Sequence, residues 1–275
     1  MTAAIRTRCL RASRLHLALA LAPLAVVLWL ASHEHLIAGT LLFVATGAVM
    51  MMGTLMPRCG LFGPMIKRLP PGSDSVLLTV DDGPHPEHTP AFLDLFDRHG
   101  IKAVFFLIGE RAAQHPELVR EIVRRGHEIG NHTQTHPASS FWSLRPPEMW
   151  QEIVTCQETL TRICPEHPPR FFRPPAGHHN MFSFIVVRCL GLRMMMWNAR
   201  GFDGVRTDVG RIVGRIRSRL EPGAIVLIHE GTPVAVEVAE EVTRMLAESG
   251  LRCGTPPSGL AFTHDEVVVE GGAAP

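Results

Sequence analysis

Between residues 76 and 250 the sequence alternates short apolar runs with longer segments in which apolar residues recur every three or four positions. The apolar runs at 76–80 and 103–108 are typical of buried strands, and the segments at 90–100 and 116–126 are typical of helices with one buried face. Strands and helices that alternate along a chain form a mainly parallel sheet with helices outside it. The sequence therefore predicts an α/β fold whose sheet is either open or closed into a barrel.

The strand predicted at 76–80 ends in two adjacent acids, Asp81 and Asp82, before Gly83 and Pro84 turn the chain. On its own this sequence also fits a surface turn. Other predicted strands, however, end in similar chemistry. The further polar residues at or just after such ends are His132, His136, Arg173, Asp203 and His229. Because the carboxyl ends of parallel strands meet at one mouth of a barrel, we expect these side chains to form an active site.

His132 and His136 are four residues apart, in a polar turn that can bring both imidazoles together. Two histidines and one carboxylate hold a divalent metal and leave positions open for water and substrate. One acid of the pair would bind the metal, and its neighbour would take a proton from the attacking water. Two alternatives compete with this hypothesis. The histidines could be solvated loop residues, or the ligand set could serve a non-haem iron oxygenase, which would leave no role for the second acid.

Composition points to a membrane segment, because 46% of the 275 residues are hydrophobic and only 19% are charged. Residues 1–14 are a basic flank without acids, and two apolar runs follow at about 15–32 and 36–56. A bilayer core takes about 20 apolar residues as a helix. The two runs predict a transmembrane helical hairpin. Since the basic residues flank its outer ends, the positive-inside rule predicts an inner-membrane protein whose catalytic domain faces the cytoplasm.

Two other interpretations of the N-terminal end stay open: a cleaved signal peptide with a poor cleavage site, and buried helices of a soluble core. Residues 57–73 are rich in proline and glycine and are predicted to be a linker near the membrane surface. The catalytic domain is expected at 74–265 and a disordered tail at 266–275. A net charge of +1 and the lack of a basic stripe argue against a nucleic-acid partner.

The polar residues at the strand ends resemble the polysaccharide deacetylase family, the NodB-homology domains of carbohydrate esterase family four. All five motifs of that family occur in order. They are T-V-D-D-G-P at 79–84, H-T-Q-T-H at 132–136, R-P-P-A-G at 173–177, a tryptophan followed by a late aspartate at 197–203, and V-L-I-H at 226–229. The resemblance implies a deformed (β/α) barrel that hydrolyses an N-acyl group, usually acetyl, from an amino sugar. It also implies a divalent metal, usually Zn²⁺.

The same resemblance assigns a role to each strand-end residue. The implied metal ligands are Asp82, His132 and His136, and the implied catalytic residues are Asp81, His229, Arg173 and Asp203. Asp81 would be the general base and His229 the general acid, with Arg173 orienting the base and Asp203 tuning the acid. Amide cleavage needs such a pair as well as a donor for the oxyanion. We expect Asp203 to raise the pKa of His229 so that the imidazole is charged near neutral pH.

The implied oxyanion donor is the backbone N–H of Ala176, and the substrate and oxyanion region would also include Pro175, Trp142 and Leu227. Trp142 fits either an apolar wall for the substrate or core packing. The family pattern is broken at three positions. Ala176 replaces a tyrosine, Arg200 replaces an earlier aspartate of the fourth motif, and Gly204 replaces a tryptophan. These changes put the substrate in question more than the chemistry.

We therefore predict a metal-dependent amidohydrolase that removes an N-acyl group from an amino-sugar-containing glycan or glycolipid at the membrane. Topology alone favours a lipid-linked or cell-envelope glycan. The alternatives are a catalytically inactive glycan-binding scaffold of the same fold and an exported peptidoglycan or polysaccharide deacetylase.

Overall fold

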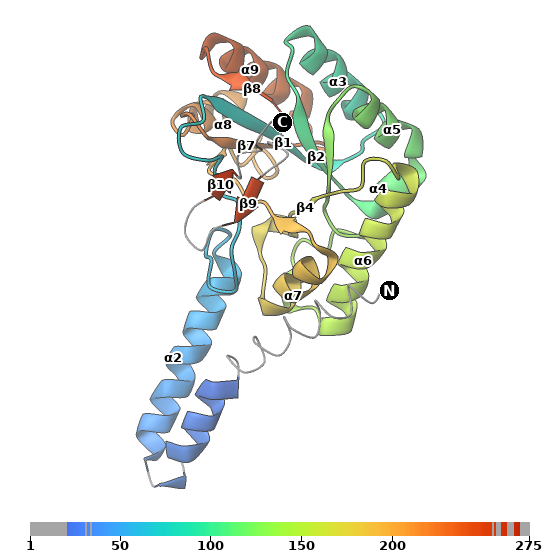
Figure 1. Cartoon of the computed structure of the whole chain (residues 1–275). Coiled ribbons are helices and arrows are strands. Elements are labelled where there is room, and N and C mark those ends of the chain that lie inside the picture. The colour runs from blue at the N-terminus through green and yellow to red at the C-terminus, as the bar shows by residue number, and fades with distance from the viewer. Residues whose placement is uncertain are drawn as a thin grey trace, which may run out of the picture.

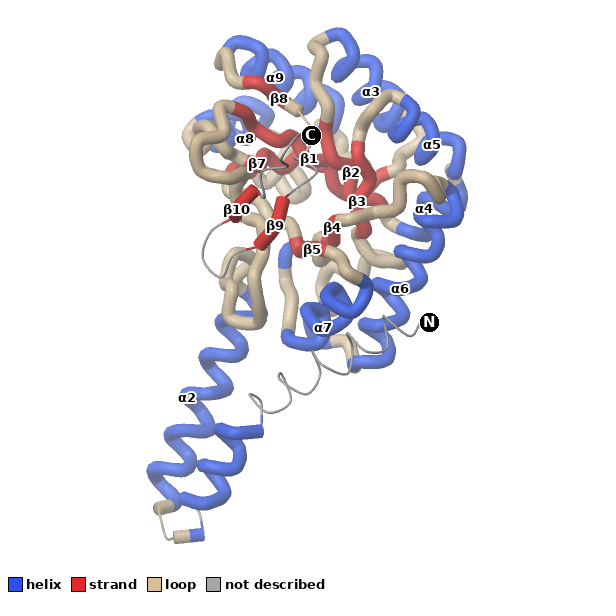
Figure 2. Tube along the Cα trace, viewed as in Figure 1, coloured by secondary structure: helices blue, strands red, loops and turns tan. Residues whose placement is uncertain are grey.

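A computed structural model describes residues 21–30, 32–33, 35–254, 256, 260–262 and 267–269. Its main body is an eight-stranded sheet in which every strand pair is parallel. The strands follow the order β5-β4-β3-β2-β1-β7-β6, and β8 pairs with the start of β1. Helices surround the curled sheet (Figures 1 and 2). The predicted α/β fold with a deformed barrel is confirmed.

The bounds of the elements are as follows. The strands are β1 (Ser75–Gly83), β2 (Ala103–Leu107), β3 (Glu128–Asn131), β4 (Phe171–Phe172), β5 (Arg193–Met194), β6 (Ala199–Arg200), β7 (Ile225–His229) and β8 (Arg252–Cys253). The helices of the body are α3 (His88–Arg98), α4 (Gly109–Gln114), α5 (Pro116–Arg124), α6 (Pro146–Ile163), α7 (Met181–Leu190), α8 (Val209–Arg217) and α9 (Ala235–Glu248), with short 3₁₀ turns η1 (Phe141–Ser143) and η2 (Pro175–Gly177). The sequence did not predict α4.

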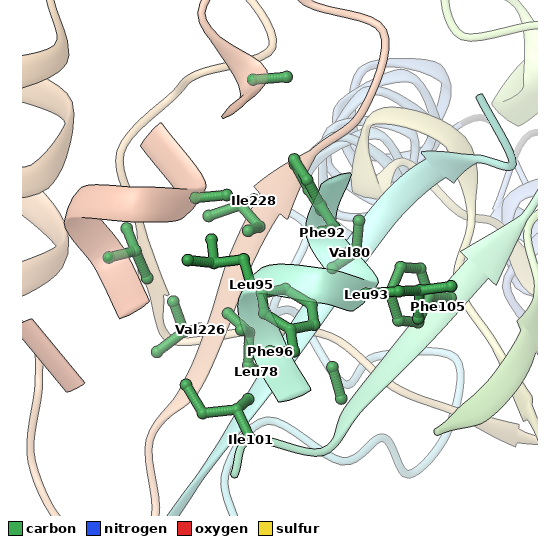
Figure 3. Packing of buried hydrophobic residues seen from close by; sticks show 14 of the residues in the cluster. Leu78, Val80, Phe92, Leu93, Leu95, Phe96, Ile101, Phe105, Val226 and Ile228 are labelled. Carbon is green, nitrogen blue, oxygen red and sulfur yellow. The ribbon is translucent and has the colours of Figure 1, made fainter. Parts of the chain in front are cut away.

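The outer core lies between the sheet and the helices that cover it. Figure 3 shows Leu78 and Val80 of β1 beside Val226 and Ile228 of β7, packed against aromatic and aliphatic residues of α3. These strand positions alternate with the inward-facing ones, as the two-residue period of a strand requires. Alternation therefore sends Thr79 and Asp81 to the opposite, inner face of the sheet.

The inner core fills the curl of the sheet and includes residues of the segment that we predicted as a linker. Within residues 57–73, the side chains of Phe62, Met65, Ile66 and Leu69 are buried in this inner cluster. Ile66 bridges to Met195 just beyond β5, and the N–H of Leu69 donates to Gly223 just before β7. The segment thus packs across the open side of the sheet, and part of the predicted linker contributes buried residues to the body.

The N-terminal part contains one helix that is long and apolar enough to cross a membrane, α2 (Leu36–Leu55). Its side chains are largely exposed, with Ile37 at 79%. A shorter apolar helix covers Leu21–Leu30 and lies beside α2 in Figures 1 and 2. Residues 1–20 fall outside the described part of the chain. The transmembrane hairpin and its orientation therefore stay predictions.

At the C-terminal end, β9 (Leu260–Phe262) and β10 (Val267–Val269) form a separate antiparallel pair. Residues 267–269 of the predicted disordered tail at 266–275 form β10, and the tail as a whole stays a prediction. Residues 266 and 270–275 lie outside the described residues.

Candidate active site

The end of β1 lies at the centre of the site because β1 is flanked by β2 on one side and β7 on the other. Its register with β2 shifts between Asp81 and Gly83. Asp82, at the shift, has a left-handed backbone with φ 70°. Non-glycine residues rarely adopt this conformation, and it persists where the surrounding structure enforces it. The irregularity lets two consecutive carboxylates serve one site, although consecutive strand residues normally face opposite sides.

The carboxylate of Asp82 and two imidazoles converge on one point. Oδ1 of Asp82 lies 3.1 Å from Nε2 of His136 and 3.4 Å from Nε2 of His132. One ligand atom from each residue lies within 4.8 Å of the other two. Oδ1 is buried and accepts no hydrogen bond from the described residues. A buried, unpaired carboxylate oxygen facing two ring nitrogens is a donor set that fits a divalent metal, so these residues could hold one.

The surroundings of the two histidines suit metal ligation. Nδ1 of His132 donates to the carbonyl oxygen of Arg173 at 2.7 Å, so Nε2 is the ring nitrogen that faces the candidate metal position. Burial and the neighbouring His132 lower the pKa of His136 to about 4, so this ring is neutral near pH 7. Burial raises the pKa of Asp82, but His132, His136 and His229 outweigh it and hold the pKa of this carboxyl below its usual range.

Arg173 holds Asp81 in place. Its Nη1 donates to Oδ1 of Asp81 at 2.6 Å and to Oγ1 of Thr79 at 2.9 Å. Its Nε and Nη2 each donate at 3.0 Å, to the carbonyls of Met195 and Met196. The guanidinium is fully buried, so its charge depends on these partners. Oδ2 of Asp81 stays free of Arg173 and lies 3.7 Å from Nε2 of His132, where a base beside the metal would stand.

His229 ends β7, the strand next to β1, and is paired with Asp203. Nδ1 of His229 lies 3.0 Å from Oδ1 of Asp203, and the N–H of His229 donates to Oδ2 at 2.6 Å. Burial lowers the pKa of His229, but Asp203, with Asp81 and Asp82, outweighs it and raises the pKa to about 9. The imidazole is therefore charged at neutral pH and can donate a proton, which agrees with the pKa direction expected from the sequence.

Ala176 sits in the turn η2 with a left-handed backbone, φ 53°, and an exposed side chain. The N–H groups of Gly177 and His178 donate to Pro174 and Pro175, whereas the N–H of Ala176 donates to no oxygen of the described residues. A free N–H at such a turn can bind an oxyanion. Ala176 therefore keeps the backbone donor although it lacks the tyrosine ring of the family pattern.

The remaining predicted substrate residues occupy different surroundings. Pro175 is buried beside Ala176. Leu227 is buried in the inner core, where it is in register with Thr79 and Arg200. Trp142 is half-buried in η1. Its indole N–H donates to the carbonyl of Ser139, and its backbone carbonyl accepts from the side chain of Asn180. Their roles toward a substrate stay predictions.

The sequence did not point to Glu230, which follows His229 directly. Its side chain is 1% exposed, and Oε2 accepts from Oγ1 of Thr89 at 2.6 Å and from the N–H of His85 at 2.9 Å. Thr89 lies in the first turn of α3, whose cap position is Glu87, and its hydroxyl donates to Glu230. Burial raises the pKa of Glu230 to about 8. Glu230 thus ties the loop after β1 to the end of β7.

Arg111 supports the same loop from α4, since it donates to the carbonyl of Asp82. Neither Arg111 nor Glu230 belongs to a strand-end motif. A glutamate and an arginine in such positions would ordinarily be solvent-exposed, so the sequence offered no signal.

The C-terminal end of α2 docks on the turn that carries Ala176. His179 is fully buried; its N–H donates to the carbonyl of Thr54 at 3.2 Å, and its Nε2 lies 3.2 Å from the carbonyl of Cys59. Gly177, with φ 78°, leaves no room for a side chain, because a Cβ there would meet Trp197 at 2.6 Å and Pro57 at 2.8 Å. The end of α2 and the predicted oxyanion turn are therefore packed together.

A parallel half-barrel with a metal-fitting triad, a buried acid–arginine pair and a charged histidine at its mouth defines a hydrolytic class of protein. Comparison with known sequences agrees. Residues 68–195 match the family described as "Polysaccharide deacetylase". A chitooligosaccharide deacetylase of Bradyrhizobium sp. (strain ANU 289) is 40% identical over 166 residues, which cover 60% of this chain and 75% of the relative. A peptidoglycan-N-acetylglucosamine deacetylase of Bacillus cereus is 31% identical over 201 residues, covering 71% and 92%.

Solved structures show the same likeness. The Bc1960 peptidoglycan N-acetylglucosamine deacetylase has a TM-score of 0.63 at 29% identity and covers 70% of this chain and 91% of its own. A family 4 carbohydrate esterase from Streptomyces lividans has a TM-score of 0.61 at 30% identity, covering 72% and 98%. A CE4 family pseudoenzyme from Bacillus anthracis has a TM-score of 0.63 at 26% identity, covering 70% and 66%.

The chain belongs to the polysaccharide deacetylase family. The predictions of this family and of a hydrolase acting on carbon–nitrogen bonds are confirmed. Members of the family depend on a divalent metal, and Asp82, His132 and His136 form the candidate site for it.

Proposed function

We propose that the protein is a Zn²⁺-dependent deacetylase that removes an acetyl group from the nitrogen of an amino sugar in a cell-envelope glycan. The observation that carries this proposal is geometric: a carboxylate held by Arg173 and an imidazole paired with Asp203 lie at the same mouth as the candidate metal ligands. Asp81 is held by Arg173, and His229 is charged, with a pKa of about 9. A base and an acid whose environments are tuned separately match the needs of amide hydrolysis.

Each step of the proposed reaction uses a group of this chain. When bound at Asp82, His132 and His136, the metal would polarise the acyl carbonyl and lower the pKa of the attacking water to about 7. Asp81 accepts a proton from that water as the carbon–oxygen bond forms. The N–H of Ala176 donates to the oxyanion that develops. His229 donates its proton to the sugar nitrogen as the carbon–nitrogen bond breaks, which releases acetate and the free amine.

The relatives named chitooligosaccharide and peptidoglycan deacetylases support an N-acetylglucosamine-containing substrate. The apolar helix α2 supports a substrate that is presented at a membrane, such as a lipid-linked sugar. We place the catalytic domain on the cytoplasmic face of the inner membrane, on the charge pattern of the N-terminal end. A C-terminal fusion to a reporter that is active only in the periplasm should then be inactive, and an active fusion would overturn this topology.

The catalytic proposal is tested on the full-length protein in detergent by measuring acetate released from N-acetylated glucosamine oligomers and from peptidoglycan fragments. Removal of metal with a chelator should abolish release, and added Zn²⁺ should restore it. Asp81→Asn should lower kcat by about 10²–10⁴-fold, since it removes the base. Asp94→Asn is the matched control, because Asp94 is an exposed acid that pairs with Arg125 on the outer surface. Full activity of the chelated enzyme or of Asp81→Asn would refute the proposal.

An inactive glycan-binding scaffold is the second candidate, because the fold neighbours include a protein named a pseudoenzyme. The observation against it is the unpaired, buried Oδ1 of Asp82, which has no purpose in a scaffold and is costly to bury. Metal analysis separates the two candidates. The purified protein should contain about one equivalent of Zn²⁺, and His136→Asn should lose most of it.

A further inference from the structure

Arg200 is a cation in the inner wall of the mouth at a position where the family pattern carries an acid. It ends β6, in register with Leu227 of β7, two residues before His229. Ala199 faces the outer core, so alternation sends Arg200 to the inner face. The charge of Arg200 acts on His178, which lies in the turn after Ala176. The pKa of His178 is lowered mainly by burial and further by Arg200. Arg200 therefore stands near both the oxyanion turn and the residues of the acid side.

The guanidinium of Arg200 is half-buried and has no carboxylate of its own. No ion pair within 4.0 Å and no hydrogen bond joins it to another residue of the described chain. The acid whose charge acts on it is Asp203, and both oxygens of Asp203 are already engaged by His229. Burial lowers the pKa of Arg200, with Asp203 opposing. A partly desolvated cation without a hydrogen-bonded carboxylate is unfavourable, and an anion from outside would relieve that cost.

Two aromatic rings hold this cation in position. The guanidinium lies 4.0 Å from the centre of the Phe202 ring and 5.2 Å from the Trp197 ring. Phe202 has a left-handed backbone, φ 68°, which is exceptional for a bulky residue. Trp197 also contacts the guanidinium of Arg173, at 5.4 Å, and so links Arg200 to the site of the base. Strain of this kind concentrates at functional positions, where it fixes a side chain before the ligand arrives.

Two positions at the mouth carry small residues where the family pattern has aromatic rings. A Cβ on Gly204 would lie 3.5 Å from the imidazole of His229, so a larger residue there would stand against the acid. Ala176 carries only a methyl group where the family pattern has a tyrosine ring. Neither the position beside the acid nor the one in the predicted oxyanion turn therefore carries a ring that would stand against a substituent on the substrate.

We propose that Arg200 forms a subsite for an anionic group of the substrate, a phosphate or a carboxylate carried on the amino sugar. The inference rests on the proposed deacetylase function and specifies its substrate class. A planar guanidinium binds phosphate or carboxylate through two parallel hydrogen bonds. The two sources of the anion are a sugar phosphate, as in a lipid-linked or nucleotide-linked sugar, and the lactyl carboxylate of a muramic acid unit.

The experiment compares three probes with the full-length, Zn²⁺-loaded enzyme: N-acetylglucosamine 1-phosphate, N-acetylmuramic acid and neutral diacetylchitobiose. Wild type should show a kcat/KM at least tenfold higher for one of the charged probes than for the neutral one, and the preferred probe identifies the source. Arg200→Gln should reduce that preference at least tenfold, and Arg200→Lys should restore part of it. Arg215→Gln is the matched control, since Arg215 of α8 lies 5.5 Å from the same Phe202 ring but is exposed.

Equal kcat/KM for charged and neutral probes, or an unchanged preference in Arg200→Gln, would overturn the subsite. A binding measurement keeps this test separate from the catalytic proposal. If no probe is hydrolysed, the deacetylase function fails. The subsite is then tested by titrating N-acetylglucosamine 1-phosphate and N-acetylmuramic acid into wild type and into Arg200→Gln. The stronger of the two should bind Arg200→Gln at least tenfold more weakly than wild type. Because anions also coordinate metals, the readout is the difference in affinity between wild type and Arg200→Gln. Equal affinities would overturn the subsite.

Discussion

Asp203→Asn should move the alkaline limb of the pH–rate profile to lower pH. Burial lowers the pKa of His229, and Asp203 is the residue that does most to raise it. The pKa of His229 is raised from its ordinary 6.5 to about 9. Asparagine keeps the size and can accept the N–H of His229, but it removes the negative charge and the charged hydrogen bond. The pKa should then fall toward its ordinary 6.5, since burial lowers it and only Asp81 and Asp82 still oppose burial.

The magnitude follows from titration. A general acid works only when protonated, so the rate falls as the pH rises above its pKa. At pH 8 the protonated fraction drops from about 0.9 at a pKa of 9 to about 0.03 at a pKa of 6.5. We therefore expect kcat/KM at pH 8 to fall by up to about 30-fold, with a smaller effect at pH 6. The change in pKa corresponds to about 3 kcal/mol between the two protonation states.

The same interaction contributes to stability with a defined sign. Since the folded-state pKa of His229 lies above its unfolded value, its contribution is complete below about pH 6.5 and is lost as the pH rises through about 9. Asp203→Asn should therefore destabilise the protein at pH 6 more than at pH 9. Thermal melting at both pH values measures this difference.

The assay is acetate release from pH 5.5 to 10, with metal content measured and matched between the proteins. Asp208→Asn is the control, because Asp208 caps α8 by accepting from the N–H of Arg211 and asparagine caps equally well. An alkaline limb within about 0.5 units of wild type, in a folded and metal-loaded Asp203→Asn protein, would refute the assignment of His229 as an acid tuned by Asp203.

Three further changes test the support of the site. Arg173→Lys should cost about 2–4 kcal/mol of stability and at least 100-fold in kcat, because an ammonium cannot reproduce the buried hydrogen bonds to Asp81 and its neighbours; a normal melting temperature would contradict this. Glu230→Gln should be more stable than wild type above pH 8 by about 1–3 kcal/mol. The buried carboxyl of Glu230 has a pKa of about 8 in the folded state, so its contribution to stability is complete below about pH 4.5 and is lost as the pH rises through 8. The same stability difference at pH 6 and pH 9 would count against this account. Gly177→Ala should destabilise by about 1–3 kcal/mol more than Gly100→Ala, because both glycines have positive φ but only Gly177 is crowded; equal costs would mean that the turn yields.

The sequence predicted most of the barrel because local patterns determine most of it. The apolar run before Asp81 could only be a buried strand, and its partners alternate with amphipathic helices whose faces match the outer core. The site was predictable for a related reason. Parallel strands bring their carboxyl ends together, so the positions of Asp82, His132 and His229 at strand ends were enough to predict that they lie close together.

What the sequence did not predict depends on contacts between distant segments. Proline and glycine at 57–73 indicate an irregular backbone, but they do not show that Phe62 and Ile66 fill the open side of the sheet. Glu230 follows a strand and would ordinarily face water; its burial results from the loop after β1, which folds over it with Thr89. The partners of Arg200 were likewise hidden, since Phe202 reaches it only through an unusual backbone conformation.

The docking of α2 on the turn of Ala176 has a practical consequence for how such a protein is produced. Apolar helices near the N-terminus are routinely deleted to obtain a protein that expresses in water. Here a truncation at residue 57 or 74 would remove the carbonyl of Thr54 from His179, and the later cut would also remove Pro57 and the buried inner-core residues Phe62 and Ile66. A shortened protein with weak activity would then report damage to the predicted oxyanion turn, and a faithful preparation keeps the chain from α2 onward.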